Sequence, residues 1–180
     1  EIELHAVDPD GFDMTWMVMG RTRPVPRAEP AQANVVAVGD AAALKAALAA
    51  AAAGDVISLA AGTYVGPFEI SASGTVDDPI VIRGASIDGT ILDGGGCPDC
   101  NVIEVYGSFV HIERVTIQAA NRGLRFQGMG AQGNVVRRTR FRDVGLGIGG
   151  REDQRDFYLC DNELSGPLVC LTMRARRSFH

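Results

Sequence analysis

Residues 110–171 contain an internal repeat of 22–24 residues, and few folds are compatible with a repeat of that length. Three segments of similar apolar and polar pattern align with one another: 110–117, 134–141 and 157–164. In this alignment Ile117, Phe141 and Leu164 correspond, at spacings of 24 and 23 residues. Each segment has the length and composition of a β-strand, so the alignment predicts one strand in each of three successive repeats.

A second set of strands repeats together with the first. Leu124, Leu146 and Leu168 occupy equivalent positions in three short apolar segments, and each follows the previous one by 22 residues. Two strand families that advance together predict the coils of a parallel β-helix, in which each coil pairs with the coil below and buries an inward stack. A β-sandwich would reverse the strand direction and would not keep the apolar phase.

The rest of the chain after Gly54 has the same character. Apolar segments of three to five residues, such as residues 80–82, alternate with Gly, Asp and Asn, and no further helical period is found. With 46% hydrophobic and 22% charged residues in 180, the composition is that of one globular domain and not of a disordered chain. We therefore predict an all-β fold, a right-handed parallel β-helix that extends from Val35 to Leu171.

One helix is predicted at the start of this solenoid. Asp40 is a suitable N-cap, residues 41–53 are almost entirely alanine, and Gly54 is placed to end the helix. Leu44 and Leu48 lie on one face, and so narrow an apolar stripe can pack on a flat surface but cannot support a helical bundle. We expect this helix to cap the N-terminal end of the β-helix.

The first 33 residues differ from the remainder. Residues 1–20 contain two alternating stretches around the turn Asp8–Gly11, which predict two short strands. Residues 21–33 contain three prolines and no apolar period, which predicts a linker or an extended strap. The predicted organisation is a β segment at 1–20 that is the tail of a preceding domain or a lid, a linker at 21–33, and a β-helix at 34–180 that is incomplete at its C-terminus.

Two segments carry a family resemblance. Residues 53–64 read Ala-Gly-Asp-Val-Ile-Ser-Leu-Ala-Ala-Gly-Thr-Tyr, and residues 73–84 read Ser-Gly-Thr-Val-Asp-Asp-Pro-Ile-Val-Ile-Arg-Gly. They are similar to the first coils of secreted right-handed parallel β-helix proteins, in particular the alginate lyase and chondroitinase B group of polysaccharide lyases, with pectate-lyase-like proteins as more distant relatives. The resemblance extends over residues 35–115. Its motifs are glycines and turns that shape the first coils, so they are specific for the fold and weak for the activity.

The resemblance implies a secreted, polysaccharide-directed protein, namely the N-terminal part of a lyase that cleaves uronic-acid polysaccharide by β-elimination. Such a lyase needs a base near the C5 proton of the sugar and a cation for its carboxylate. The family's catalytic lysine and arginine lie on later coils, and no residue here aligns with them; the only lysine, Lys45, is on the predicted helix. We expect this chain alone to lack a complete active site, and catalysis by the full-length protein stays open. The alternative is a non-catalytic β-helix that serves as an adhesin, a spike or a glycan-binding scaffold.

Charge is unevenly distributed along the chain, whose net charge is −5. Residues 111–180 contain twelve arginines and seven acidic residues, so an anionic partner would meet this half of the chain. In the repeat alignment Arg114 lies beneath Arg138, and Arg140 follows on the same side. Arginine recognises carboxylates with paired hydrogen bonds. We therefore assign Arg114, Arg138 and Arg140 as candidate substrate-binding residues for an anionic polysaccharide.

The same arginines have a structural alternative. The spacing of about 4.8 Å between coils brings Arg138 within ion-pair reach of Asp161, and Arg140 within reach of Glu163. A ladder of compensated surface charges, in which each pair contributes little to stability, would give the same sequence pattern. We take this ladder as the default interpretation, against which substrate binding has to be tested.

Asp161, Asn162 and Glu163 offer oxygen atoms of the kind that bind Ca²⁺, and the family resemblance makes Ca²⁺ a candidate cofactor. However, Asn162 aligns with Val115 and Thr139, which should face the coil interior at a corner. An asparagine stacked in a turn is therefore expected there, and not a metal ligand. We identify no metal ligands in this chain and predict no other cofactor.

Four cysteines are present. Cys97 and Cys100 have the spacing of a redox or zinc-knuckle pair. Cys170 aligns with an inward core column, whereas Cys160 aligns with Arg137 at an outer bend, so a zinc site made from all four is disfavoured. A local disulfide between Cys97 and Cys100 is one alternative in a secreted protein, and two free thiols are the default expectation.

His111 lies between the inward-facing Val110 and Ile112, so we expect it to point outward and to be an exposed surface residue. No Ser-His-Asp order, Walker-type phosphate loop or aromatic and basic platform for nucleic acid is found. The longest run of low polarity, residues 46–53, is far too short to span a bilayer. We therefore expect neither a nucleic-acid partner nor a membrane partner.

The resemblance places the protein outside the cytoplasm, as a secreted, periplasmic or cell-surface protein. After the predicted strand Leu168–Leu171, the last nine residues have no apolar period. A parallel coil ends in unpaired N–H and C=O groups, which proteins normally cover. We therefore expect self-association through this open C-terminal coil.

Overall fold

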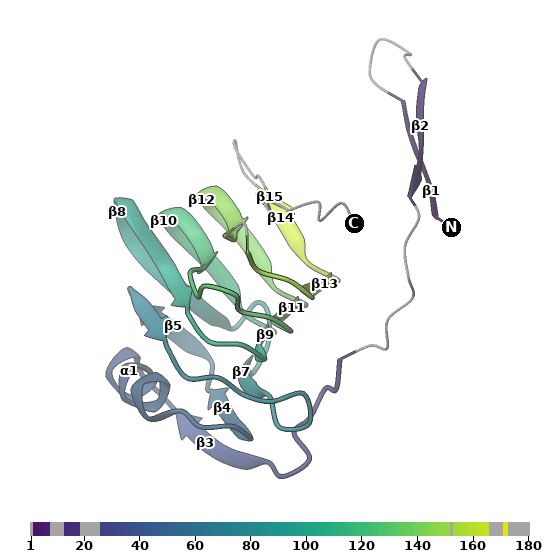
Figure 1. The fold of residues 1–180 in the computed structure, drawn as a ribbon. Helices are drawn as coiled ribbons and strands as arrows, with labels where there is room; N and C mark the ends of the chain where they lie inside the picture. The colour runs from purple at the N-terminus through teal and green to yellow at the C-terminus, as the bar shows by residue number, and fades with distance from the viewer. Residues whose placement is uncertain (1, 8–12, 19–25, 152, 166–170, 173–180) are drawn as a thin grey trace.

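The computed structural model describes residues 2–7, 13–18, 26–151, 153–165 and 171–172. Parallel strands wind into a β-helix whose coils form two sheets (Figure 1). The six-stranded sheet contains β3 (Asn34–Val38), β4 (Asp55–Leu59), β7 (Ile80–Gly84), β9 (Val110–Glu113), β11 (Val135–Arg137) and β13 (Tyr158–Cys160). The seven-stranded sheet contains β5 (Gly62–Val65), β6 (Phe68–Ile70), β8 (Thr90–Val105), β10 (Thr116–Phe126), β12 (Arg140–Gly149), β14 (Glu163–Ser165) and β15 (Leu171–Thr172). The prediction of an all-β parallel solenoid is confirmed.

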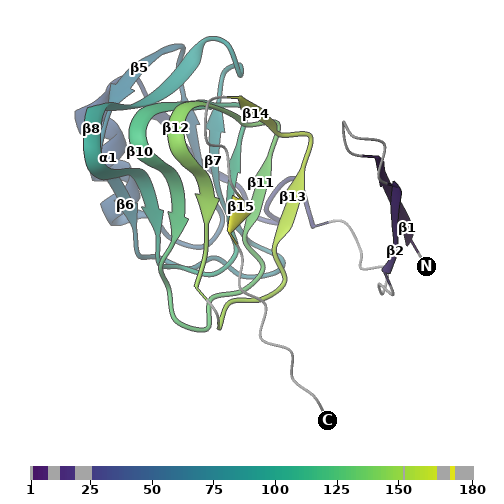
Figure 2. The same ribbon diagram turned by 90° about the horizontal axis from the view of Figure 1, so that it is seen from above.

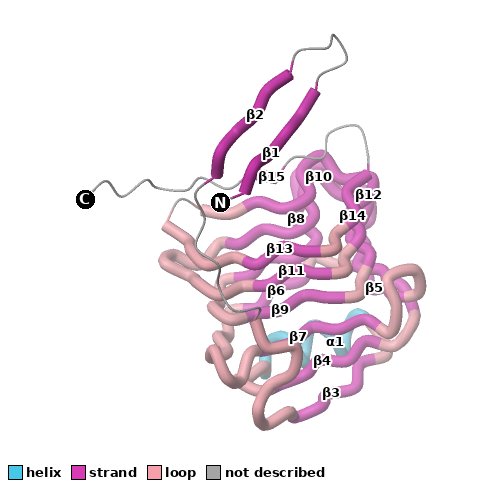
Figure 3. The backbone as a smooth tube through the Cα atoms, turned by 90° about the vertical axis from the view of Figure 1, so that its right-hand side faces the viewer, coloured by secondary structure: helices cyan, strands magenta, loops and turns pink. Residues whose placement is uncertain are grey.

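The long strands of the seven-stranded sheet bend around a corner of the coil, so this sheet supplies two sides of the cross-section (Figure 2). β5 pairs with the first part of β8, whereas β6 pairs with its last part. β10 and β12 repeat the same course above β8. The strands of successive coils are therefore stacked in layers (Figure 3).

The predicted stack of Ile117, Phe141 and Leu164 is confirmed. Ile117 pairs with Phe141, and Phe141 pairs with Leu164. Ile117 and Phe141 are fully buried, whereas Leu164 on β14 is 42% exposed. The first repeat was therefore read in the correct register from the sequence.

The second repeat was predicted in the wrong register. Leu124 pairs with Ile148 and not with Leu146, so this strand advances by 24 residues like the first. Ile148 in turn pairs with Leu171, whereas Cys170 had been aligned with it. A slip of two residues leaves the inward and outward faces of a strand unchanged, so the apolar pattern could not reveal the error between Leu124 and Leu146.

Left-handed residues turn the chain at three corners of the coil. A positive φ is rare outside glycine, and here it recurs at equivalent positions of successive coils. The corner before the six-stranded sheet contains Phe109, Gly133 and Asp156, the corner after it contains Arg114, Arg138 and Asp161, and the bend in the seven-stranded sheet contains Ala119 and Asp143. Each column fixes the direction in which the next strand leaves.

The core lies inside the coil and is mostly apolar. Tyr64 and Phe126 are among its largest fully buried side chains. Asn134 is also fully buried, and its side-chain amide forms hydrogen bonds with backbone groups of a turn. Its Oδ1 accepts from the N–H of Val110 at 2.9 Å, and its Nδ2 donates to the carbonyl of Gly107 at 3.1 Å.

The predicted helix is present as α1 (Ala41–Ala50), three residues shorter than expected. Asp40 is its N-cap, with the carboxylate accepting from the N–H of Ala43 at 2.8 Å, as predicted. The helix ends early because Asp55 accepts from the N–H of Ala52 at 2.8 Å and directs the chain into β4. Leu44 and Leu48 are buried in the core, and the capping role of α1 stays a prediction. No helix in the described ranges is long and apolar enough to span a membrane.

The two predicted N-terminal strands are β1 (Ile2–Val7) and β2 (Asp13–Val18), which pair antiparallel. Residues 26–33, which we call the strap, hydrogen-bond to the β-helix. The N–H of Ala31 donates to the carbonyl of Asp77 at 2.9 Å, and the N–H of Gln32 donates to the carboxylate of Asp78 at 2.8 Å. The assignment of residues 1–20 and 21–33 to a preceding domain, lid or linker stays a prediction.

Candidate functional site

Arg114 and Arg138 occupy equivalent positions at the corner that follows the six-stranded sheet. The N–H of Arg114 donates to the carbonyl of Arg138 at 3.0 Å, and the N–H of Arg138 donates to the carbonyl of Cys160 at 3.2 Å. Both arginines have left-handed backbones, with φ of 59° and 49°, and both are exposed. The predicted stacking of Arg114 beneath Arg138 is therefore confirmed.

An open groove of about 390 Å³ follows this corner. It is lined by Ser86, Ile87, Arg114, Arg138, Asp161 and Glu163, and we call it the arginine groove. Two residues of the lining are cationic and two are anionic, so the groove is polar and close to neutral in total. Any preference for an anion must therefore come from the placement of the two guanidinium groups and not from net charge.

Arg140, the third predicted residue, is held by two carboxylates. Its Nε donates to Glu163 at 2.6 Å, and its Nη1 donates to Asp88. The hydrogen bonds to Glu163 and Asp88 raise the pKa of Arg140 further above its usual value. The ion pair predicted between Arg140 and Glu163 is therefore confirmed, and Arg140 would have to release a carboxylate to bind a ligand.

Arg114 and Arg138 differ from Arg140. Arg138 makes no ion pair with Asp161 or with any other residue that the structure describes, so this predicted rung of the ladder is absent. Arg114 donates a hydrogen bond from Nη2 to the carbonyl of Ala85. Register places Arg138 and Asp161 side by side, but it does not fix where a long exposed side chain points. Arg114 and Arg138 thus keep donors for an external anion.

The arginine groove can bind an anion, and its two carboxylates are Asp161 and Glu163, of which Glu163 is paired with Arg140. Its lining contains neither lysine nor histidine nor tyrosine. Arginine remains protonated at any ordinary pH and cannot act as a base. The arrangement suits recognition of carboxylate groups by Arg114 and Arg138 through charge-assisted hydrogen bonds.

Asn162 is not free to act as a calcium ligand. The amide of Asn162 is used by the turn: Oδ1 accepts from the N–H of Thr139 at 3.0 Å, and Nδ2 donates to the carbonyl of Val136 at 2.9 Å. Asn162 therefore stacks in the turn as the sequence predicted. Within the described ranges no group of three or more His, Cys, Asp or Glu residues could hold a metal ion.

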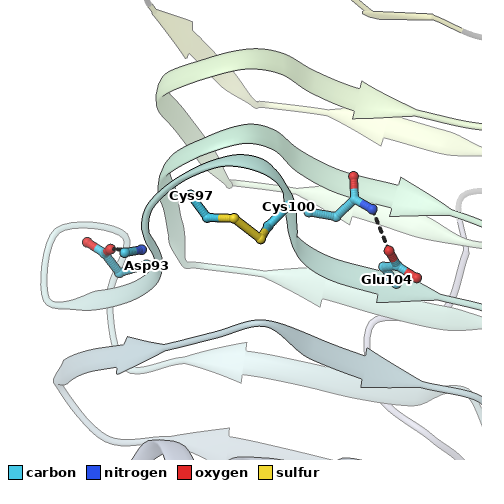
Figure 4. The surroundings of a disulfide bond; sticks show 6 residues. Asp93, Cys97, Cys100 and Glu104 are labelled. Atoms are coloured by element: carbon cyan, nitrogen blue, oxygen red, sulfur yellow. Dashed lines mark hydrogen bonds between the residues drawn. A yellow bond between two sulfur atoms is a disulfide. The ribbon is translucent and has the colours of Figure 1, made fainter.

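Cys97 and Cys100 form a disulfide, which corrects the default expectation of two free thiols (Figure 4). The bond closes a bulge of β8, where the chain takes extra residues between its pairs Asp93 with Gln118 and Asn101 with Arg122. The three preceding glycines allow this bulge, which brings the two thiols to the same side. Cys160 is a free cysteine opposite Arg137, and Cys170 lies outside the described residues.

His111 points away from the coil interior, as predicted, but it is not exposed. Its side chain is only 3% exposed, in an outer column between Val81 and Val135, which are both fully buried. Burial, and then the positive charge of Arg137, lower the pKa of His111 to about 4 against the opposing effect of Glu113. The expectation of a surface histidine was wrong because the outer face of this sheet is covered.

A buried ion triad lies beside His111, and sequence reasoning missed it. Glu113, whose side chain is 5% exposed, accepts hydrogen bonds from Arg83 and Arg137. Burial alone would raise the pKa of Glu113, but the hydrogen bonds from the two arginines outweigh it and hold this pKa below its usual value. Arg83 also pairs with Glu29 of the strap at 2.6 Å. The strand register could have revealed this triad, because β7, β9 and β11 place Arg83, Glu113 and Arg137 at paired positions.

Comparison with known proteins supports the fold. No protein-family model matches the sequence, and no curated protein matches it. Among solved structures, the alginate lyase from Paenibacillus sp. str. FPU-7 is similar, with a TM-score of 0.66 and 26% sequence identity. The match covers 71% of this chain and 43% of the lyase chain, so this chain spans less than half of that protein. The resemblance to the alginate lyase group of parallel β-helix proteins, inferred above from residues 53–64 and 73–84, is confirmed.

Proposed function

We propose that this chain is part of a protein that acts on uronic-acid polysaccharides, and that the arginine groove contacts the polysaccharide. The observation that carries the proposal is the pair Arg114 and Arg138, two exposed guanidinium groups without a carboxylate partner among the described residues. The likeness to an alginate lyase supports an anionic polysaccharide as the substrate class. Arg140 belongs to the same surface and would contribute by exchanging Glu163 or Asp88 for a sugar carboxylate.

For the full-length protein we propose β-elimination. In this reaction a base removes the proton at C5, a double bond forms between C4 and C5, and the C4–O bond breaks. The departing oxygen takes up a proton from water and leaves as a hydroxyl. Arg114 and Arg138 can bind the carboxylate of the sugar, but the groove lining contains no lysine, histidine or tyrosine to serve as the base. We therefore propose that these coils are the N-terminal, polysaccharide-binding part of a lyase whose base lies outside the described residues.

The proposed location is outside the cytoplasm, in the periplasm, at the cell surface or in the medium. The disulfide between Cys97 and Cys100 supports this, because such bonds persist in oxidising compartments and are rare in the cytosol. Self-association through the C-terminal coil also remains a proposal, since residues 166–170 and 173–180 lie outside the described part. Sedimentation velocity over a range of protein concentrations would test it, and a monomer at all concentrations would contradict it.

A second candidate function is a non-catalytic glycan-binding scaffold. The absence of lysine, histidine and tyrosine from the lining of the arginine groove favours it. Both functions require that the groove bind an anionic polysaccharide, and they differ only in whether a product is formed.

The test combines a product assay with a binding assay. The full-length protein is incubated with alginate, pectate and chondroitin, and absorbance from unsaturated uronate products is followed while binding is measured at several salt concentrations. Product formation indicates a lyase, and binding without product indicates the scaffold. If neither binding nor product is observed, both proposed functions are wrong and only the fold assignment stands.

The groove itself is tested with the double substitution Arg114→Asn and Arg138→Asn. Asparagine tolerates the left-handed backbone at both positions, so folding should be retained. We expect binding to weaken on the order of tenfold or more and to lose its salt dependence. Arg155→Asn, at an exposed position on the opposite corner of the six-stranded sheet, is the matched control. Unchanged affinity in the double variant would assign both arginines to a structural role.

A further inference from the structure

We propose that the strap is an acid-sensitive latch, which is released from the outer face of the six-stranded sheet when the imidazole of His111 binds a proton. In the open state the β-helix keeps its coils, and only residues 26–33 leave its surface. The latch is independent of the polysaccharide site proposed above, because neither His111 nor the strap contributes a residue to the arginine groove.

The strap covers a column of side chains on the outer face of this sheet. Paired positions on β4, β7, β9 and β11 are occupied by Val56, Val81, His111 and Val135. Each of the four is 3% exposed or less, although the three valines do not belong to the apolar core cluster inside the coil. Pro30 of the strap is buried as well. These side chains point away from the coil interior, so their burial depends on the strap.

The strap is held by polar contacts that can open without unfolding the sheet. The carbonyl of Ala28 accepts from Nη2 of Arg83 and from Nη2 of Arg137, at 3.3 Å in each case. Glu29, whose side chain is 58% exposed, pairs with Arg83 at 2.6 Å. Such a solvated pair contributes little to stability. When the strap leaves, both arginines keep their shared partner Glu113, so the buried triad stays intact during a local opening.

The closed state offers no acceptor for a second proton on His111. The Nδ1 atom is buried and has no hydrogen-bond partner within the described ranges. An imidazolium ion carries a proton on both ring nitrogens, so protonation in the closed state would leave a buried N–H without an acceptor. In the open state water supplies this acceptor. Proton binding therefore favours release of the strap.

Burial and charge act against an imidazolium ion in the same direction. Burial, and then Arg137, lower the pKa of His111 to about 4, against the opposing effect of Glu113. On release of the strap the pKa should return toward the ordinary value of 6.5, so opening should become more frequent as the pH falls from 6.5 to 4. The charged and titratable groups on the surrounding elements are Glu113 on β9, Arg83 on β7, Arg137 on β11, Tyr158 on β13, Arg27 and Glu29 on the strap, Asp77 before β7 and Asp156 at the corner before β13.

Amide hydrogen exchange of the full chain, followed by NMR, measures the opening. The N–H of Ala31 donates to the backbone carbonyl of Asp77 at 2.9 Å, an acceptor that does not titrate, and reports release of the strap. The N–H of the core residue Ile80 donates to the carbonyl of Phe109 at 3.0 Å and reports global unfolding. After correction for intrinsic exchange, the opening constant at Ala31 should rise about 30-fold between about pH 7.5 and about pH 5. Ile80 should exchange far more slowly than Ala31 at both pH values.

Two variants identify the group that binds the proton. His111→Val matches the valines of its column, so the fold should be kept and the opening constant at Ala31 should no longer rise between these pH values. Glu29→Gln is the matched control, since it removes a titrating carboxylate from the strap itself. Ala31 should then open more often at both pH values, because the ion pair with Arg83 is lost, while the rise between them is kept.

Four results would overturn the latch. Equal protection of Ala31 and Ile80 would mean that the strap leaves only when the whole fold unfolds. A rise of less than about threefold in the wild type would mean that opening is not linked to a proton. The same rise in His111→Val would assign the linkage to another group. Loss of the rise in Glu29→Gln would assign it to Glu29, and this comparison needs no folded His111→Val protein.

Discussion

Arg137 and Arg138 are consecutive in the chain, yet they lie in opposite environments. The side chain of Arg137 is 10% exposed and shares the carboxylate of Glu113 with Arg83. Arg138 is exposed, has a left-handed backbone and makes no ion pair within the described ranges. Both side chains point away from the core. A side chain that points away from the core is therefore not always exposed in this protein. The strap covers the outer face of the six-stranded sheet but leaves the corner open.

The difference is also one of electrostatic cost. Around Arg137 the charges are removed from water, so each must be paired and hydrogen-bonded. At the corner of Arg138 water solvates the guanidinium group, and a missing partner costs little. The covered face is thus suited to stability, whereas the open corner is suited to reversible binding of an anion.

The largest effect is expected from Glu113→Gln. Removing this carboxylate leaves Arg83 and Arg137 next to each other without a shared partner, which should lower the free energy of unfolding by about 3 to 5 kcal/mol. Glu163→Gln is the matched change at the open corner, where the partner Arg140 is 24% exposed and Glu163 is 58% exposed. Its effect should be about 1 kcal/mol or less. Urea unfolding of both variants measures the difference, and equal effects would contradict the contrast between the covered and the open arginines.

A smaller effect, also on the covered face, comes from the pH dependence of His111. In the native protein this residue stays neutral down to about pH 4, whereas in the unfolded chain it binds a proton below about pH 6.5. The unfolded state therefore binds more protons in this window, so the free energy of unfolding should fall as pH is lowered from 6.5 to 4, by roughly 3 kcal/mol at most.

His111→Val should remove this contribution. The difference between wild type and variant in unfolding free energy should change across the window from pH 6.5 to 4 and be constant above it. Glu113, whose pKa is lowered, adds a loss of stability at lower pH in both proteins. A difference that is independent of pH would mean that His111 is solvated in the native state.

The smallest effect is expected from glycine at the corner. Arg138 has φ of 49°, a backbone conformation that costs an L-residue about 1 to 2 kcal/mol and that glycine adopts without this cost. Glycine also has greater conformational freedom in the unfolded chain, which lowers the stability of the fold by about 0.5 to 1 kcal/mol. Arg138→Gly should therefore stabilise the fold by about 0.5 kcal/mol. Arg137→Gly, one residue earlier, should destabilise it by several times as much, and thermal unfolding of the pair compares them. Destabilisation by Arg138→Gly would show that its side chain contributes to the fold.

Much of the fold could be predicted because its information is local and periodic. The stack of Ile117 on Phe141, the N-cap at Asp40 and the stacked Asn162 each follow from residue type and spacing along one strand or turn. The second repeat was misread because leucine is equally acceptable two positions apart on the same face, as Leu146 shows. The stacking of Arg114 and Arg138 in one column could be predicted from the repeat. That Arg138 makes no ion pair within the described ranges could be seen only from the positions of the side chains.

The sequence by itself determined the coil period, the inward and outward faces and the column that contains Arg114 and Arg138. Only the tertiary structure decided that the outward His111 is buried and that Arg137 is bound. The physical reason is the distance along the chain: Arg137 donates to the carbonyl of Ala28, which lies 109 residues away, and no periodicity relates the two. A repeat determines how each coil packs on the next. It contains no information on which part of its outer face a segment from outside the repeat will cover.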